Sequence, residues 1–434
     1  IEVFYMNYHN LWKKAEKIIP GGNGLLSKRP KRFLSSGWPT YFKKAKGIYL
    51  WTLDNKKLVD FSIMGIGTAI LGYANNTIDK KVKLAIDKGI NTTLNCIEEY
   101  QLAKEILKYN KFAQQVKFAK GGGEAMAMAI RIARSNSKKY KVVFSGYHGW
   151  HDWYISANLS DIQNLNNHLL KDLKPLGVPN NLKNSIMPLK FNDHEQLIKI
   201  FKENKDAGIL VIEGARNDYP SKEFVKAINK LKLKKKIIVI IDEITSGWRE
   251  CLGGVYKKVN LNPDIVVYGK ALGNGYPISA VVGKRKIMEI SNQTFISSTA
   301  WTERIGFVAA LATIRFMKKN NVSSKIMKKG KKVIDGWKKL AFKNQLEITT
   351  NKFYSMPTFS FNYEKNNDKL NTLFTKYMLE KGYIATNYMF ITFAHNENEI
   401  KKYLKVCNVV FKKIKQDLSN KVKLKKITSR KMTY

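Results

Sequence analysis

The chain contains few cysteines and no long apolar run. Its 434 residues include 3 cysteines, Cys96, Cys251 and Cys407, which lie far apart and form no CxxC pair. This spacing predicts neither a disulfide framework nor a zinc site. No apolar run approaches the length that crosses a membrane, and the first residues lack a charged start followed by an apolar core. We therefore expect a cytoplasmic protein with no membrane partner.

Acidic residues are also scarce, with 34 Asp and Glu against 77 Lys and Arg, and the formal net charge is +43. Such a charge is typical of nucleic-acid-binding proteins when the basic residues form one patch. Here lysines occur almost everywhere along the chain, so we interpret them mainly as a solvated surface and expect no nucleic-acid partner. Only the segment after Lys412 is dense enough to resemble a basic arm.

The order of apolar runs and helical patterns predicts an α/β fold. Residues 47–61, GIYLWTLDNKKLVDF, alternate in polarity and turn at Asp54, which predicts a hairpin leading into the main domain. Short apolar runs then occur at 116–119, 142–144 and 209–212, each followed by a turn or a helical pattern. This alternation predicts a mostly parallel sheet with helices on both faces.

The length exceeds the usual size of a single hydrophobic core, so we expect one large and one smaller domain. After a helical pattern at 303–319, further strand candidates alternate with helical stretches, the last of which covers 397–418. We predict a smaller α+β domain formed by both chain ends. The predicted boundaries give an N-terminal segment at 1–50 that joins the small domain, a large domain at 51–315, and a C-terminal part of the small domain at 316–434.

An acid and a lysine each follow a short apolar run. Asp242 follows IIVII, and Lys270 follows IVVY by two residues. Both side chains should therefore lie at the carboxyl ends of buried parallel strands, where open α/β sheets bind ligands. A lysine beside an acid suits a Schiff-base lysine and an acidic partner for the pyridinium nitrogen of pyridoxal phosphate. A structural ion pair is the alternative interpretation.

The motif GGGEAMAMAIRIAR, 121–134, places three glycines between a strand and a helix. Backbone amides at such a turn, together with the helix dipole, suit a cofactor phosphate, although a simple tight connection gives the same pattern. Farther along, the motif FISSTAWTERIG, 295–306, offers the hydroxyls of Ser297, Ser298 and Thr299 to a phosphate. A helix cap at Thr302 is the alternative for that segment.

Two more strand ends carry candidate groups. The motif GYHGWHDWY, 146–154, offers Tyr147 or His148 as a flat group that lies on a pyridine ring. Its histidines lack acidic and cysteine companions, so we expect no metal. The motif IEGARND ends another strand with Glu213 and then Asn217, whose amide suits a bond to the cofactor's phenolic oxygen. Polarity common to any strand end is the alternative here.

Together these motifs resemble the class III, fold-type I pyridoxal-phosphate aminotransferases, within the glutamate-1-semialdehyde 2,1-aminomutase-like branch. The likeness runs from about residue 19 through 314, and its markers appear in the family's order: IIPGG, GIYLWTLDNKKLVDF, GGGEAMAMAIRIAR, GYHGWHD, DEITSGWR and VVYGKALGNGYP. The resemblance implies that Lys270 forms the internal aldimine, that Asp242 binds the pyridine nitrogen and that Tyr147 lies against the ring.

The resemblance also implies that Gly122 and Gly123 bind the cofactor phosphate. It further implies that Thr299 reaches the phosphate held by a neighbouring subunit, and hence a homodimer with shared active sites. The chain departs from the family at this turn, because the usual Ser-Gly-Thr is Gly-Gly-Gly here. A hydroxyl contact is therefore lost, and more weight falls on backbone amides.

The substrate side departs from the family as well. The aminomutase has an arginine soon after PGG that binds a substrate carboxylate, and Arg29 or Arg32 is the loose equivalent here. The aminomutase also carries a glutamate in a segment resembling ATNYMFITFAH, 385–395, which contains no acid in this chain. These differences favour a transaminase with a different substrate.

We therefore predict a pyridoxal-phosphate-dependent aminotransferase that moves an amino group from a donor, such as glutamate, to a carbonyl acceptor. The alternative is glutamate-1-semialdehyde 2,1-aminomutase, in which the transfer is intramolecular. A distant alternative is a non-catalytic basic nucleic-acid-binding protein, for which the net charge of +43 is the only motive.

Overall fold

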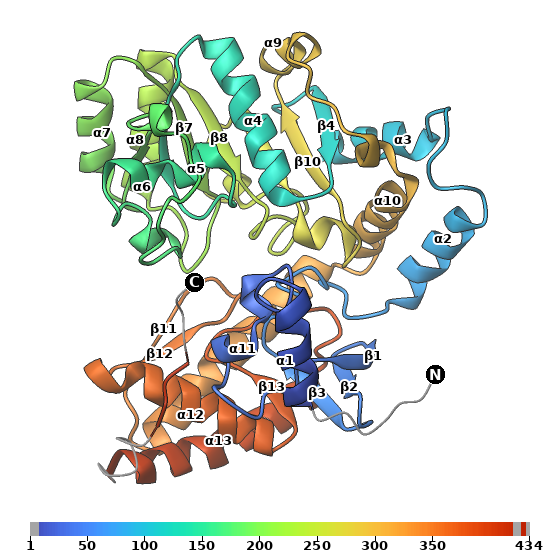
Figure 1. Ribbon diagram of the computed structural model, residues 1–434, viewed down its shortest axis with the longest axis vertical. Helices are drawn as coiled ribbons and strands as arrows, with labels where there is room; N and C mark the ends of the chain where they lie inside the picture. The colour runs from blue at the N-terminus through green and yellow to red at the C-terminus, as the bar shows by residue number, and fades with distance from the viewer. Residues whose placement is uncertain (1–7, 420–426, 431–434) are drawn as a thin grey trace. The chain divides into compact units, whose positions relative to one another are not determined.

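The computed structural model describes residues 8–419 and 427–430 of the chain (Figure 1). These residues divide into two compact units, with divisions at 75/76 and 324/325. One unit comprises the middle of the chain, and the other combines the two ends. The basic segment expected after Lys412 lies partly outside the described residues.

The middle unit contains a seven-stranded sheet of order β4-β10-β9-β8-β7-β5-β6. Its strands are β4 (Gln115–Ala119), β5 (Lys141–Ser145), β6 (Ile186–Pro188), β7 (Ala207–Glu213), β8 (Ile238–Asp242), β9 (Ile265–Tyr268) and β10 (Ser279–Gly283). Only β10 runs antiparallel to its neighbours, β4 and β9. The other six strands therefore point the same way, and their carboxyl ends lie at one edge. The predicted mostly parallel sheet is confirmed.

Three adjacent strands, β7, β8 and β9, are buried along their whole length. They read as continuous runs of Ile, Val and Leu because both faces of a parallel sheet are covered. Their burial explains why the sequence showed unbroken apolar runs instead of alternation.

Helices cover both faces of this sheet. The chain crosses it in one direction from β4 through α4 (Gly122–Ser137) to β5, and returns through α7 (His194–Glu203) and α8 (Lys222–Lys235). Since such crossovers are almost always right-handed, opposite directions place α4 on one face and α7 with α8 on the other. Figure 1 shows α4 lying across the near face of the sheet.

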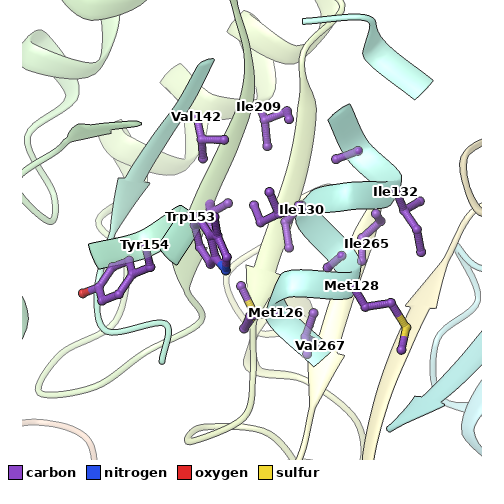
Figure 2. Close-up of a cluster of buried hydrophobic side chains, with 14 of the residues drawn as sticks. Met126, Met128, Ile130, Ile132, Val142, Trp153, Tyr154, Ile209, Ile265 and Val267 are labelled. Atoms are coloured by element: carbon purple, nitrogen blue, oxygen red, sulfur yellow. The ribbon is translucent and has the colours of Figure 1, made fainter. Parts of the chain in front are cut away.

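A cluster of buried hydrophobic side chains lies between α4 and the sheet (Figure 2). Helix α4 buries a broad apolar face in which small alanines alternate with larger side chains, so the helix approaches the strands closely. The short helix α5 (Asp152–Ile155) adds two aromatic rings to the same cluster. Labelled members in Figure 2 are Met126, Met128, Ile130, Ile132, Val142, Trp153, Tyr154, Ile209, Ile265 and Val267.

The rest of the middle unit is helical. The pattern predicted at 303–319 forms α10 (Arg304–Lys319), which packs on α2 (Asn76–Ile86) and α3 (Ile97–Lys108). Helix α10 also packs against the short 3₁₀ turn Lys270–Gly273 that follows β9. Two shorter helices, α6 (Ala157–Ser160) and α9 (Arg285–Met288), complete the set.

The other unit is α+β and draws on both chain ends, as predicted. Its sheet has the order β1-β2-β3-β13, and its strands are β1 (Phe42–Lys46), β2 (Tyr49–Thr52), β3 (Lys57–Phe61) and β13 (Tyr383–Ala385). The remaining elements are α1 (Tyr8–Ile18), α11 (Val322–Lys343), β11 (Ile348–Thr350), β12 (Phe359–Phe361), α12 (Asn367–Glu380) and α13 (Glu397–Ser419). No helix in the described part of the chain is long and apolar enough to span a membrane.

The predicted hairpin is present as β2 and β3, which pair antiparallel. Strand β3 pairs on its other side with β13 in parallel, so a strand from the C-terminal region completes the sheet. Because of this pairing the hairpin belongs to the unit formed by the chain ends. The first boundary between the two units therefore falls at 75/76, whereas the sequence predicts it at 50/51. The second division, at 324/325, lies nine residues or so beyond the expected position at 315/316.

Truncating a side chain in the core under α4 should destabilise the protein. Ile130 is 2% exposed in this cluster, and Ile130→Ala should lower the free energy of unfolding by about 2–5 kcal/mol because it leaves a cavity. Leu233→Ala on α8 is the matched control, since Leu233 is 77% exposed and its loss should change stability by less than about 0.5 kcal/mol. Urea denaturation followed by circular dichroism measures both. Equal effects would contradict the assigned core.

Candidate active site

Polar side chains gather where the parallel strands end. Glu213 is the last residue of β7 and pairs in register with Asp242, the last residue of β8. Asp242 in turn pairs with Val267 of β9, three residues before Lys270. Electrostatic interactions link Lys270 to both carboxylates. The structure therefore brings together Asp242, Glu213 and Lys270, three of the residues predicted from sequence.

Asp242 is held by a histidine. Its Oδ2 lies 2.8 Å from Nδ1 of His148, and its Oδ1 accepts a 2.9 Å hydrogen bond from the backbone amide of Ile244. Asp242 and His148 are only 4% and 1% exposed. The sequence offered Tyr147 or His148 as a flat group for the ring, and the structure places His148 beside Asp242. Its Nε2 is buried without a hydrogen-bond partner among residues 8–419 and 427–430.

Lys270 occupies an uncommon backbone conformation, with φ of 42°. This left-handed region is unfavourable for a lysine and marks a position where the surrounding structure enforces the geometry. Its Nζ donates a 2.7 Å hydrogen bond to Oγ1 of Thr245. Burial, reinforced by the positive charge of Arg216, lowers the pKa of Lys270 from its usual 10.5 to about 8. A lysine with this pKa is a much better nucleophile near neutral pH than an ordinary one.

Arg216 is a site residue that the sequence analysis missed. Its Nε donates a 2.8 Å hydrogen bond to Oε2 of Glu213, and its Nη2 donates to Oε1. Burial by itself would raise the pKa of Glu213, but the adjoining guanidinium outweighs burial and lowers it. The sequence feature that could have identified Arg216 is its position three residues after Glu213, an acid at the end of a strand. Asn217, predicted to bind the phenolic oxygen, has an exposed side chain.

Tyr147 follows β5 and lies next to these carboxylates. Its amide donates a 3.3 Å hydrogen bond to Oε2 of Glu213, and its ring meets that of Tyr154 edge-on at 6.1 Å. Burial raises the pKa of the Tyr147 hydroxyl, with nearby charges contributing less. The preceding Gly146 has φ of 120°, and a Cβ there would lie 2.5 Å from Cγ of Glu213. Glycine is therefore required where the chain passes over Glu213.

The glycine turn forms a close-packed cradle at the start of α4. The side chain of Glu124 accepts a 2.7 Å hydrogen bond from the amide of Gly121, the residue that caps the helix. The amides of Gly122 and Gly123 belong to the first helical turn, where no intrahelical acceptor exists. A Cβ on Gly122 would lie 3.0 Å from Cδ1 of Ile244. The cradle fits an anion such as a phosphate, because it presents backbone amides at a helix N-terminus.

A second layer of buried charge lies behind Asp242. Glu243 is fully buried and accepts hydrogen bonds from Ser246 Oγ at 2.5 Å and from the Tyr256 amide at 2.9 Å. Burial raises the pKa of Glu243 to about 7. Arg249 is also fully buried, its Nε donates to the carbonyl of Thr245 at 2.6 Å, and burial lowers its pKa to about 9. Thr245 thus holds Lys270 by its hydroxyl and Arg249 by its carbonyl.

The remaining predicted residues come from other segments of the chain. Thr299 begins a 3₁₀ turn, Thr299–Thr302, and its side chain is exposed together with those of Ser297 and Ser298. The contact with a neighbouring subunit's phosphate stays a prediction. Arg29 and Arg32 belong to the unit formed by the chain ends. The guanidinium of Arg29 packs on Gly21, where a Cβ would lie 2.0 Å from Nη2.

A third arginine of that unit escaped the sequence analysis. Arg430 donates from Nη2 to Oδ1 of Asn387 at 3.1 Å, and its amide donates to Oγ1 of Thr372 at 3.0 Å. Burial lowers the pKa of Arg430, and the nearby charge of Arg32 lowers it further. The two arginines therefore face a common region. No local pattern pointed to Arg430, because its partners lie more than forty residues away in the sequence.

A lysine and an acid at the carboxyl edge of a mostly parallel sheet, beside a glycine-capped helix, define a fold-type I pyridoxal-phosphate enzyme. The chain belongs to the class-III aminotransferases, whose family profile, described as "Aminotransferase class-III", matches residues 35–382. Its cofactor is pyridoxal phosphate, which the amide cradle and the paired Asp242 fit.

Curated relatives support this assignment. The 3-aminobutyryl-CoA aminotransferase of Cloacimonas acidaminovorans (strain Evry) is 31% identical over 332 residues, which cover 74% of this chain and 76% of that protein. The glutamate-1-semialdehyde 2,1-aminomutase of Wigglesworthia glossinidia brevipalpis is 30% identical over 440 aligned residues, which cover 94% of this chain and 98% of that protein. The two relatives carry different activities within one family.

Solved structures share the fold. The pyridoxal-phosphate internal aldimine form of the Sphingopyxis sp. MTA144 FumI protein superposes with a TM-score of 0.86 and 20% identity, covering 98% of each chain. A glutamate-1-semialdehyde aminomutase from Pseudomonas aeruginosa PAO1 superposes with a TM-score of 0.80 and 16% identity, covering 94% of each chain. At these identities the likeness concerns the fold alone.

The lowered pKa of Lys270 should set the pH dependence of cofactor capture. Only the neutral amine attacks an aldehyde, so the rate at which cofactor-free protein binds pyridoxal phosphate covalently should rise with pH and level off above about 8. Stopped-flow absorbance measures this rate, and Lys270→Ala is the control that should show no covalent capture. A midpoint near the ordinary lysine pKa of 10.5 would contradict the description of the site.

The lowered pKa of Lys270 also makes the free energy of unfolding depend on pH. Between pH 8 and 10.5 Lys270 is mostly neutral in the folded protein and still protonated in the unfolded chain. Because the unfolded state then binds more protons, Lys270 makes the free energy of unfolding rise with pH across this window. Comparing cofactor-free wild type with Lys270→Met isolates the effect, and an identical pH dependence in both would count against it.

Proposed function

We propose that the protein is an intermolecular transaminase that moves an amino group from an amino acid donor, such as glutamate, to a carbonyl acceptor. The observation that carries the amino-transfer chemistry is Lys270, whose amine meets Thr245 at 2.7 Å and lies in the field of Asp242. Intermolecular transfer is favoured over intramolecular transfer because residues 385–395 contain no carboxylate, where the aminomutase pattern has one.

Each residue of the cluster has a role in this proposal. Pyridoxal phosphate, when bound, supplies a ring that accepts electrons from the substrate carbon. Asp242 would hold the ring nitrogen, and its hydrogen bonds from His148 and Ile244 keep the carboxylate oriented. Lys270 would hold the cofactor and then, once displaced by substrate, move a proton at its Nζ.

The rest of the cofactor would be held by neighbouring groups. Tyr147 would lie against the ring, and the amides of Gly122 and Gly123 would bind the phosphate. Glu213 would keep Arg216 in place through its two hydrogen bonds. A contact between Asn217 and the phenolic oxygen remains part of the proposal, since its exposed side chain can turn toward a ligand.

Arg216 is the residue that we propose to bind the carboxylate of the amino donor. It uses Nε and Nη2 on Glu213, so Nη1 remains for a second anion. Its charge also acts on Lys270, so the two groups share one electrostatic environment. Arg29 and Arg32 remain the candidates from the N-terminal region for a second carboxylate.

The aminomutase remains a second candidate because its relatives match this chain over nearly its full length. The Wigglesworthia protein of that name covers 94% of the chain, whereas the match to the aminobutyryl-CoA aminotransferase covers 74%. An aminomutase would convert glutamate 1-semialdehyde without a separate amine donor, and that property distinguishes the two candidates.

We also propose that the protein is a homodimer with shared active sites. Large apolar side chains that a monomer would leave in water support this, namely Phe295 at 90%, Leu94 at 81% and Trp150 at 73% exposed. Phe295 lies four residues before Thr299, the residue proposed to reach the neighbouring phosphate. A cytoplasmic location is supported by Cys96, Cys251 and Cys407, which are all free thiols.

Titration with L-glutamate tests the proposed reaction. The visible absorbance of the lysine-linked cofactor should disappear as 2-oxoglutarate is released in equal amount, because the first half of a transamination leaves the amine on the cofactor. The control variant Lys270→Ala should retain its fold but release no 2-oxoglutarate. A spectrum that glutamate leaves unchanged, together with conversion of glutamate 1-semialdehyde without a donor, would identify the aminomutase instead.

Replacing Arg216 should weaken the binding of donors that carry a carboxylate. Arg216→Met should raise the KM for glutamate by about 10-fold or more, since a charge-assisted hydrogen bond is lost. A donor amine without a carboxylate is the control substrate, and its KM should change little. Because Arg216→Met leaves Glu213 without its partner, the double variant Arg216→Met/Glu213→Gln separates substrate binding from a folding defect. Equal losses for both kinds of donor would exclude the proposed role.

A further inference from the structure

A histidine ring takes up space beside the phosphate turn. A Cβ placed on Gly123 would lie 3.1 Å from Cδ2 and 3.2 Å from Nε2 of His151. These contacts are tighter than most Cβ contacts, so a serine or threonine at position 123 would require the imidazole to shift by a few tenths of an ångström. The ring therefore lies directly beside the position from which a side chain of residue 123 would extend.

The backbone around His151 is built to hold the ring there. Gly149 has φ of 105°, and a Cβ on it would lie 3.0 Å from Cα of Gly123, so glycine lets the loop lie directly on the turn. The imidazole stacks on Trp150 with ring centroids 4.5 Å apart and an interplanar angle of 23°. The carbonyl of His151 accepts hydrogen bonds from the amides of Tyr154 and Ile155, which anchor it at the start of α5.

The ring nitrogen on the Gly123 side, His151 Nε2, is buried and lacks a hydrogen-bond partner within the described ranges. A buried donor without a partner is costly, so such an atom calls for a ligand. The adjoining amides of Gly122 and Gly123 are also donors, while the amide of Gly121 is already bound to Glu124. The group that satisfies these neighbouring donors together must be an acceptor, and an anion at a helix N-terminus is the favoured kind.

We propose that His151 binds the phosphate of pyridoxal phosphate through Nε2 and replaces the hydroxyl contact that the Gly-Gly-Gly turn lacks. The inference rests on the assignment of the chain to a pyridoxal-phosphate family, and it is independent of which amino donor the enzyme uses. It accounts for a glycine at position 123, because a side chain there would press on the imidazole.

The test measures cofactor affinity directly. His151→Phe keeps a flat ring against Trp150 and removes the donor, so the dissociation constant for pyridoxal phosphate, measured by equilibrium dialysis, should rise about 10-fold or more. The ³¹P NMR resonance of the bound phosphate should shift as well. His151→Gln, which retains an N–H donor, should fall between wild type and His151→Phe. His194→Phe in α7, on the opposite face of the sheet, is the matched control, with affinity within about twofold of wild type.

A pair of substitutions at positions 123 and 151 gives a second test of the proposal. Gly123→Ser alone should weaken cofactor binding, because its Cβ meets the imidazole at 3.1 Å. In a His151→Ala background the same serine should strengthen binding, since the space is vacant and the hydroxyl restores a donor. A change of sign between the two backgrounds is the expected result, and additive losses would overturn the proposal.

Unchanged affinity and an unchanged ³¹P resonance in His151→Phe would also overturn it. Should His151→Phe fail to fold, as judged by circular dichroism, His151→Gln and the serine pair decide the matter. All of these measurements use cofactor without substrate. A failure here therefore differs from a failure of the proposed transamination, which would leave cofactor binding intact while glutamate remained unconverted.

Discussion

The register among β7, β8 and β9 is the constraint on which the site depends. Pairing of Glu213 with Asp242, and of Asp242 with Val267, puts three strand ends at one level. Since side chains alternate between faces of a strand, a slip of one residue would turn Asp242 toward the opposite face and separate it from His148. Complete burial of these strands on both faces favours the register, because a slip would carry a strand-end carboxylate away from its polar partners into apolar surroundings.

Burial then sets the chemistry of the charged groups. In a region of low dielectric, charges act on one another far more strongly than in water. Glu213 keeps its negative charge because Arg216 lies against it, whereas Lys270 is driven toward its neutral form by burial and by Arg216. The same guanidinium therefore stabilises an anion and lowers the pKa of the amine. Sequence relatives share the family but carry different reactions, so substrate choice depends on groups around this common centre.

The phosphate turn shows how one departure from a family pattern is accommodated. Gly-Gly-Gly removes every side chain from the turn, and the loop after β5 approaches it so closely that a Cβ on Gly123 would lie 3.1 Å from His151. Gly149 allows that approach, since a Cβ there would meet Gly123. Loop and turn therefore form one packed unit, in which each small residue makes room for a larger neighbour. A larger residue in either segment should therefore change the packing of the other.

The sequence by itself determined the α/β class, the hairpin, and the positions of Asp242 and Lys270. These features follow local rules: buried strands require apolar runs, and polar residues just after them lie at one sheet edge. Only the tertiary structure decided which groups meet. His148 lies 94 residues from Asp242, and Arg430 lies 43 residues from Asn387, so no local spacing joins them. The pairing of β3 with β13, which assigns the hairpin to the unit of the chain ends, is likewise long-range. Contacts of this kind depend on how the whole chain packs, so the periodicity of apolar residues in the sequence does not predict them.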